Sequence, residues 1–142
     1  MISDKLSLQG RLDIVVTSPD GVVKEEHCVK NVVVTTGKNY VASRMAGTSA
    51  NVMSHMSIGT GTTAAAAGDT TLGSESGRVS LTSTTVNNND VVYVATFPAN
   101  TPASAAAITE AGIFNAGSSG SMLCRTVFSP VNKQTADSLT IT

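Results

Sequence analysis

Apolar and polar side chains alternate near the N-terminal end of the chain. Over residues 6–16, apolar residues occupy every second position except that of Gly10. A period of two is typical of a β-strand with one buried and one exposed face. Residues 18–21 (SPDG) have the composition of a tight turn, and residues 22–29 return in an extended pattern. The sequence therefore predicts a β-hairpin in this region.

A single short helix is predicted over residues 38–46. Thr36 is suited to the N-cap position, and Val41 and Met45 lie one turn apart on one face. Gly47 is placed to end the helix. A helix of this length is stable only when it packs against another element.

Most of the remaining chain consists of short extended segments separated by turn residues, such as residues 87–90 (NNND). The further strands expected are 52–58, 78–86, 91–97, 108–115, 122–129 and 137–142. With the hairpin, this gives about eight strands and one short α-helix in a single domain, residues 1–142. We predict a mainly β fold, an antiparallel β-sandwich or barrel that is jelly-roll-like.

Residues 59–77 form a long irregular loop in this prediction. They are mostly Gly, Thr and Ala and show no regular period. Such a segment buries too little apolar area to offset the entropy of ordering, so we expect a partner to order it. The alternatives are an exposed connection, or a loop that Leu72 pins to the core. The residues predicted to contact a partner are Gly59, Thr60, Gly61, Thr62, Thr63, Asp69, Leu72 and Glu75.

The composition limits the classes of function. Charged residues make up 13% of the 142 residues, against about 25% in typical soluble domains, and the net charge is −1. The sequence has no basic block, so we expect no nucleic-acid partner. It also lacks a run of about 18 apolar residues, so we expect no membrane span. Cys28 and Cys124 form no disulfide framework. We interpret both as reduced, part-buried small side chains of a protein made in a cytosol.

No pattern of residues predicts catalysis or cofactor binding. Glu110 is the most interesting carboxylate, because it lies between apolar residues. A structural ion pair with Arg78 or Arg125 is favoured over a catalytic acid. A metal site would need a chance meeting of Cys28, Cys124 and a histidine, because no ligand cluster is visible in the sequence. We therefore expect no enzyme, no cofactor and no metal, and a low-charge surface that packs against other proteins.

Three segments resemble a family of small structural proteins of tailed-bacteriophage particles. They are NVVVTTGKNYVASRMAG, MSHMSIGTGTTAAAAGDTTLGSE and ITEAGIFNAGSSGSMLCRTVF, at residues 31–47, 53–75 and 108–128, with ADSLTIT at the end. The segments cover about half of the chain, and their combination is more specific than any one of them. The resemblance implies a virion component on the capsid surface, a head decoration (cement) protein whose partner is the major capsid protein.

Two other placements stay open. Similar phrases occur in tail-fibre proteins, so the resemblance also fits a tail, baseplate or fibre-attachment protein. We prefer the head because the chain is one domain without a fibrous repeat. A carbohydrate-binding or adhesin module would normally expose more aromatic residues than Tyr40, Tyr93 and three phenylalanines provide.

Two segments are expected to contact other chains. The last strand, 137–142, is predicted at an exposed sheet edge, which favours a homo-oligomer, a trimer before a dimer. Residues 1–5 are a candidate N-terminal arm that adds to a neighbouring chain.

Overall fold

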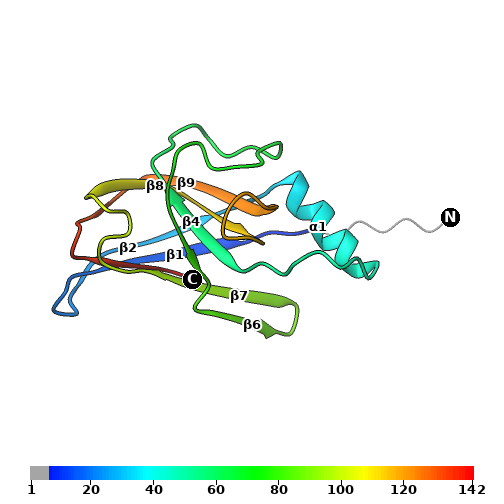
Figure 1. Ribbon diagram of the computed structural model, residues 1–142, viewed down its shortest axis with the longest axis horizontal. Coiled ribbons are helices and arrows are strands. Elements are labelled where there is room, and N and C mark those ends of the chain that lie inside the picture. Colours follow the sequence, from blue (N-terminus) through cyan, green and yellow to red (C-terminus); the bar gives the residue numbers. More distant parts are fainter. Residues whose placement is uncertain (1–6) are drawn as a thin grey trace.

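Two antiparallel five-stranded sheets face each other in the computed structural model, which describes residues 7–142 (Figure 1). The predicted arm at residues 1–5 lies outside the described residues. The first sheet contains β2 (Val23–Lys30), β1 (Arg11–Thr17), β10 (Ser138–Ile141), β7 (Asp90–Phe97) and β6 (Ser83–Asn87), in that order. The second contains β3 (Val32–Val33), β9 (Met122–Lys133), β8 (Ala106–Phe114), β4 (His55–Gly59) and β5 (Glu75–Ser80).

The core lies between the sheets and is made of side chains that alternate inward from both. Its fully buried members include Ile14, Val16, Phe97, Ile108, Val131, Leu139 and Ile141. All three phenylalanines are buried, and Tyr40 and Tyr93 pack against the core. The predicted mainly β sandwich is therefore confirmed, with ten strands in residues 7–142 in place of about eight.

The predicted turns are confirmed by backbone geometry. Gly21 has a φ of +85° and donates its N–H to the Ser18 carbonyl at 2.9 Å, which closes the β1–β2 hairpin. Asn88 has a φ of +55° in the turn between β6 and β7. Both hairpins therefore follow from turn residues that tolerate positive φ.

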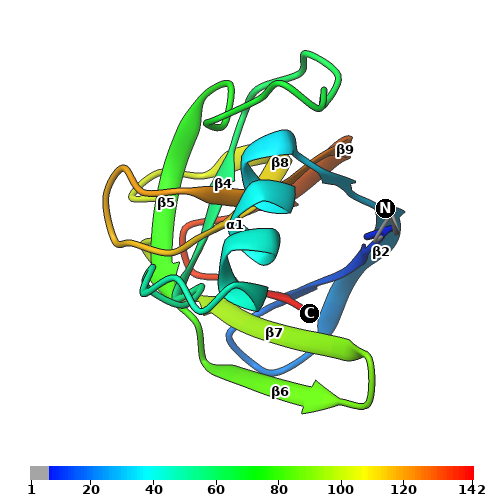
Figure 2. The same cartoon turned by 90° about the vertical axis from the view of Figure 1, so that its right-hand side faces the viewer.

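The helix α1 (Thr35–Met45) begins earlier than predicted and is held differently. Its N-cap is Val34, which makes no side-chain cap bond, so the assignment of Thr36 as the cap is wrong. Met45 is 75% exposed, whereas Gly37 is buried beside the Leu123 carbonyl of β9. The helix thus packs through its first turns, and Figure 2 shows it across one end of the sandwich. Gly47, with φ +79°, follows its end as expected.

The strand predicted at 78–86 is two strands in different sheets. β5 ends at Ser80 in the second sheet, and β6 begins at Ser83 in the first. At the crossing, the Leu81 N–H is bound by the Ser54 carbonyl and the Thr82 N–H by the Val94 carbonyl. Uninterrupted β-branched and polar residues do not reveal such a transfer, because both halves remain extended.

The last strand is internal, which corrects the prediction of an exposed edge at 137–142. β10 lies between β1 and β7 and pairs with both. Leu139 and Ile141 are each 0% exposed. The free sheet edges within the described residues are instead β2, β6, β3 and β5.

Leu139→Ala tests this central placement of β10. We expect the free energy of unfolding to fall by about 2–5 kcal/mol, because the truncation leaves a cavity between the sheets. Val52→Ala, at a position that is 61% exposed, should change it by less than about 0.5 kcal/mol. Urea denaturation of both variants gives the values. Equal small losses would mean that β10 is not a core strand.

Candidate functional site

The irregular segment of the chain forms a third layer on the outside of the second sheet. β4 ends at Gly59 and β5 begins at Glu75, so the loop is shorter than predicted and consists of residues 60–74. We call this segment the covering loop. Figures 1 and 2 both place it over β8 and β9. Residues 108–114 of β8 are buried on both faces of the strand. One face meets the core, and the covering loop protects the other.

The carboxylate of Glu110 holds the two ends of the covering loop together. Its Oε1 accepts the backbone N–H groups of Gly61 at 2.9 Å and Ser74 at 2.6 Å. Its Oε2 accepts the N–H of Gly73 at 2.8 Å. Glu110 is 0% exposed, and its position on β8 fixes where both ends of the loop must lie.

Arg125 on the neighbouring strand β9 completes this arrangement. Its Nε and Nη2 donate to Glu110 Oε2 at 3.0 and 2.8 Å, so the pairing predicted for Glu110 is confirmed with Arg125. Its Nη1 donates to Asp69 Oδ2 at 2.8 Å, and its Nη2 to the Thr63 carbonyl at 3.1 Å. One guanidinium thus binds the sheet carboxylate and the middle of the loop. Glu110, Arg125 and Asp69 are called here the loop clamp.

A small apolar cluster lies beside the loop clamp. Leu72 is 6% exposed and belongs to a cluster with Val34, Phe114 and Met122. A Cβ on Gly112 would lie 3.0 Å from both Leu72 Cδ2 and the Cys124 carbonyl oxygen, so the absence of a side chain there lets Leu72 pack closely on β8. Leu72 thus pins the loop, but to this separate cluster and not to the core between the sheets. The expectation that only a partner can order the loop is wrong, because polar contacts within the chain order it.

Arg78, the other candidate partner of Glu110, binds Glu75 and the turn after β8 instead. It donates to both carboxylate oxygens of Glu75, at 2.9 and 2.7 Å, and to the carbonyls of Ala116 and Ser119. Its guanidinium lies 3.8 Å from the centroid of the Phe114 ring. This cation–π contact joins β5 to the end of β8.

The electrostatics keep the loop clamp ionised. Burial raises the pKa of the Glu110 carboxyl, but the N–H groups of Gly73, Ser74 and Gly61 and the Arg125 guanidinium together lower it below its ordinary value of 4.5. The Ala66 N–H and Arg125 lower the pKa of Asp69. Burial opposes the charge of Arg125, yet its two carboxylates raise its pKa overall. One guanidinium is therefore shared by two carboxylates, of which Glu110 is fully buried and Asp69 is partly exposed.

The residues predicted to contact a partner divide into two groups. Those exposed at the surface are Thr60, Thr62, Thr63 and Glu75. Those turned inward are Gly59, Gly61, Asp69 and Leu72, which hold the loop in place. Sequence reasoning missed the roles of Gly73 and Ser74, because a backbone N–H leaves no signature in residue type.

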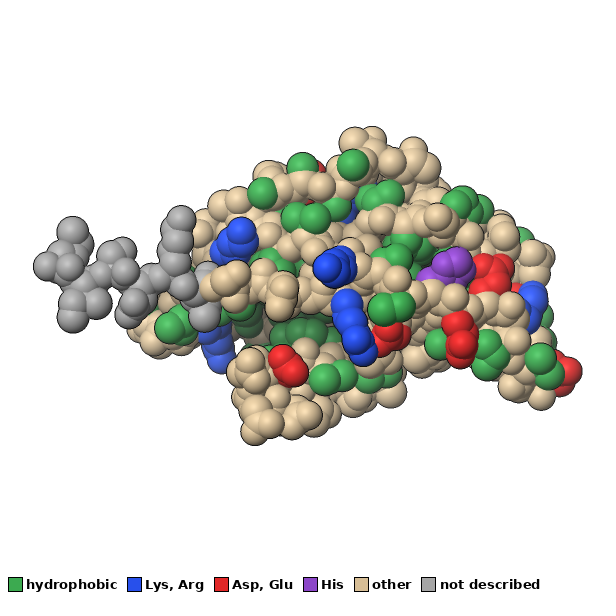
Figure 3. All heavy atoms as spheres, turned by 180° about the vertical axis from the view of Figure 1, so that it is seen from behind, with side chains coloured by type: hydrophobic (Ala, Val, Ile, Leu, Met, Phe, Trp, Pro, Cys, Tyr) green, Lys and Arg blue, Asp and Glu red, His purple; other side chains and the backbone are tan. Residues whose placement is uncertain are grey.

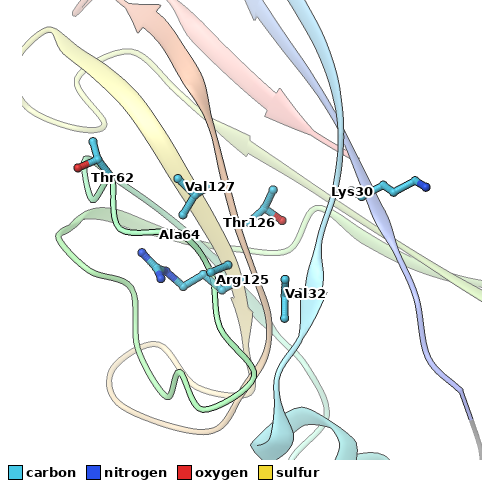
Figure 4. A pocket seen from close by; sticks show the side chains of 8 residues that line it. Lys30, Val32, Thr62, Ala64, Arg125, Thr126 and Val127 are labelled. Atoms are coloured by element: carbon cyan, nitrogen blue, oxygen red, sulfur yellow. The ribbon is translucent and has the colours of Figure 1, made fainter.

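A concavity beside the covering loop offers no converging charged groups. It measures about 270 Å³ and is lined by Lys30, Val32, Thr62, Ala64, Ala65, Arg125, Thr126 and Val127. In Figure 4, the Arg125 side chain turns into the loop and Lys30 points away from the other lining side chains. The Arg125 guanidinium is already bound by Glu110 and Asp69, so the role that this geometry supports for the loop clamp is structural.

The two cysteines lie on different sheets. Cys28 is exposed on β2, which corrects its prediction as part-buried, and Cys124 is buried on β9. Both are free thiols. Within residues 7–142, no three His, Cys, Asp or Glu side chains lie close enough together to hold a metal ion. Among the same residues, no helix has the length and apolarity needed to span a membrane.

Comparisons with protein-family models, curated proteins and solved structures find no match to this chain.

Glu110→Gln tests the loop clamp directly. The substitution replaces an ionised acceptor by a neutral amide and leaves Arg125 buried with only Asp69 as its counter-ion. We expect the free energy of unfolding to fall by about 3 kcal/mol at pH 7, measured by urea denaturation. Glu26→Gln on the exposed face of β2 is the matched control and should change little.

The loss should also depend on pH. Because the native pKa of Glu110 is lowered, the unfolded chain takes up the proton first on acidification. The stabilisation is complete above a pH of about 4.5 and disappears as the pH falls through the native pKa. The wild type and Glu110→Gln should therefore approach the same stability in acid. A difference that stays constant from neutral to strongly acidic pH would contradict an ionised Glu110.

Proposed function

We propose that this chain is a non-enzymatic structural protein of a tailed-phage virion, a decoration (cement) protein that binds the outside of the capsid lattice. The observation that carries the proposal is the covering loop. It projects from the sandwich, exposes small uncharged side chains, and is held in one conformation from beneath by the loop clamp. Its partner in the proposal is the major capsid protein.

The loop clamp reduces the cost of binding. A flexible loop of small residues would lose about 1–2 kcal/mol of conformational entropy per residue on docking. Here the chain has met much of that cost on folding, so more of the contact energy remains for affinity. The exposed hydroxyls of Thr60, Thr62 and Thr63 carry no charge to desolvate. The small side chains also allow main-chain groups of a partner to approach closely.

The phage-like phrases of the sequence contain two residues of the loop clamp and several residues that contact it or anchor the loop. IGTGTT contains Gly61, GDTTLGSE contains Asp69, Leu72 and Gly73, and ITEAGIFN contains Glu110. The combination that carries the resemblance is therefore the combination that presents the loop. This supports a shared mode of loop presentation across the resembling proteins, and with it a binding role over a catalytic one.

Many copies bound to an assembled lattice would stabilise it by mass action. A protein that binds the closed lattice and not its ruptured form lowers the free energy of the closed form. Repeated sites on one particle add avidity without any new contact. The mechanism needs a stable surface and no chemical step.

A tail, baseplate or fibre-attachment role is the second candidate. The same presented loop would serve there, and the resemblance to tail-fibre phrases favours it. The two placements differ in which purified part of the particle binds the protein.

Binding to particles that lack this protein tests the proposal. Thr62→Lys together with Ala64→Lys places two charges on the exposed crest of the covering loop, and neither side chain makes a hydrogen bond within the described residues. We expect wild-type folding and a loss of head binding of at least about tenfold, measured by co-sedimentation. Thr96→Lys, an exposed position on the outer face of the first sheet, is the control and should bind as the wild type does.

Two outcomes would contradict the proposal. Wild-type occupancy by the double variant would mean that the covering loop is not the contact surface. Binding to purified tails and not to heads would replace the decoration role by the tail role.

A further inference from the structure

The four free sheet edges differ in how they are protected against pairing with another chain. β3 has two residues, which is too short to template a strand. β5 carries the paired charges of Glu75 and Arg78. The residues of β2 that carry charge are Lys24, Glu25, Glu26 and Lys30. Short length and charged side chains are the usual devices that prevent edge-to-edge association.

β6 lacks both of these devices. Its sequence, STTVN at Ser83–Asn87, has no charged residue and no proline, and all five residues are exposed. Figures 1 and 2 show β6 as the outermost strand of a hairpin that projects from the sandwich. In Figure 3 this projecting part is mostly uncharged polar surface. β6 is thus an open, uncharged strand edge.

The register of the hairpin shows which groups the edge offers. Asn87 and Asp90 flank a two-residue turn and face each other, so they form a hydrogen-bonded pair. Because hydrogen-bonded and non-bonded pairs alternate, Thr85 directs its N–H and C=O toward β7. Thr84 and Val86 direct theirs outward, away from the sheet. Two donors and two acceptors therefore lie ready on the free edge.

The hairpin also leaves apolar side chains uncovered. Val86 and Val91 face each other across the two strands and are 72% and 48% exposed. Along β7, Val91 continues the inward-facing row of Tyr93, Ala95 and Phe97. The hairpin therefore extends the core face of the sheet beyond the end of the core.

We propose that β6 is a homodimer interface, in which two copies pair their β6 strands antiparallel about a two-fold axis through Thr85. Thr84 of each copy then lies opposite Val86 of the other, and the two Thr85 residues face each other. The outward groups of Thr84 and Val86 make the inter-chain hydrogen bonds, and the two first sheets become one ten-stranded sheet.

The observations favour a second copy over an unrelated partner strand. The register is self-complementary. Thr84 and Val86, whose backbone groups point away from β7, lie opposite each other, and Thr85, whose backbone groups point toward β7, lies opposite Thr85 of the other copy. An uncharged strand also meets its own copy without repulsion, and cross-strand pairs of Thr and Val are favourable. An isologous contact of this kind closes at two copies. It replaces the trimer expected from an exposed last strand, and it does not depend on the proposed capsid role.

Charge substitutions at Thr85 test the interface. Sedimentation velocity of the wild type over about 10 μM to 1 mM should show a monomer–dimer equilibrium, since the contact area is small. Thr85→Lys and Thr85→Glu each place like charges face to face and should weaken the dimer at least about tenfold. An equimolar mixture of the two variants should form heterodimers at low salt. Thr96→Lys, on the outer face of β7, should dimerise as the wild type does.

A cross-link provides a second measurement that does not depend on affinity. In a Cys28→Ser background, Thr85→Cys places two thiols across a non-hydrogen-bonded antiparallel pair, where the Cα separation suits a disulfide. We expect mild oxidation to give a covalent dimer, and Thr96→Cys to give little. A wild type that stays monomeric at 1 mM, a trimer, or a dimer that neither charge at Thr85 weakens would overturn the proposal.

Discussion

The outer layer of this fold depends on a fully buried carboxylate on the outer face of the second sheet. Glu110 lies on β8 and is 0% exposed, and an unpaired charge there would cost several kcal/mol. The chain satisfies the charge by bringing residues 60–74 over it. Three backbone N–H groups and one guanidinium meet the two oxygens. The long loop and the buried charge therefore require each other.

This dependence explains why a segment of small residues is ordered. Most of its residues bury little apolar surface, and Leu72 is its only large apolar anchor. Its position comes from polar contacts with Glu110 and Arg125, which act best out of water. The outside of the loop is thereby free to carry small hydroxyl and methyl groups. This uncharged outer surface is the one that the proposed docking would use.

The parts of the structure that follow from local pattern could be predicted, and those that depend on distant partners could not. Strand alternation, the turns at Gly21 and Asn88, and an ion pair at Glu110 were all visible in the sequence. The ordered conformation of the covering loop could not be predicted, because the partners of Glu110 are mainly backbone groups. The internal position of β10 could not be predicted either, because a four-residue edge strand and a four-residue central strand have similar sequences.

Amide hydrogen exchange on the isolated protein tests the central claim most directly. If the loop clamp orders the covering loop without any partner, the amides of Gly61, Gly73 and Ser74 exchange slowly, at rates comparable to those of the second sheet. The exposed amides of Thr62 and Ala64 exchange much faster. Exchange of all five amides at the rate of an unstructured peptide would contradict the account.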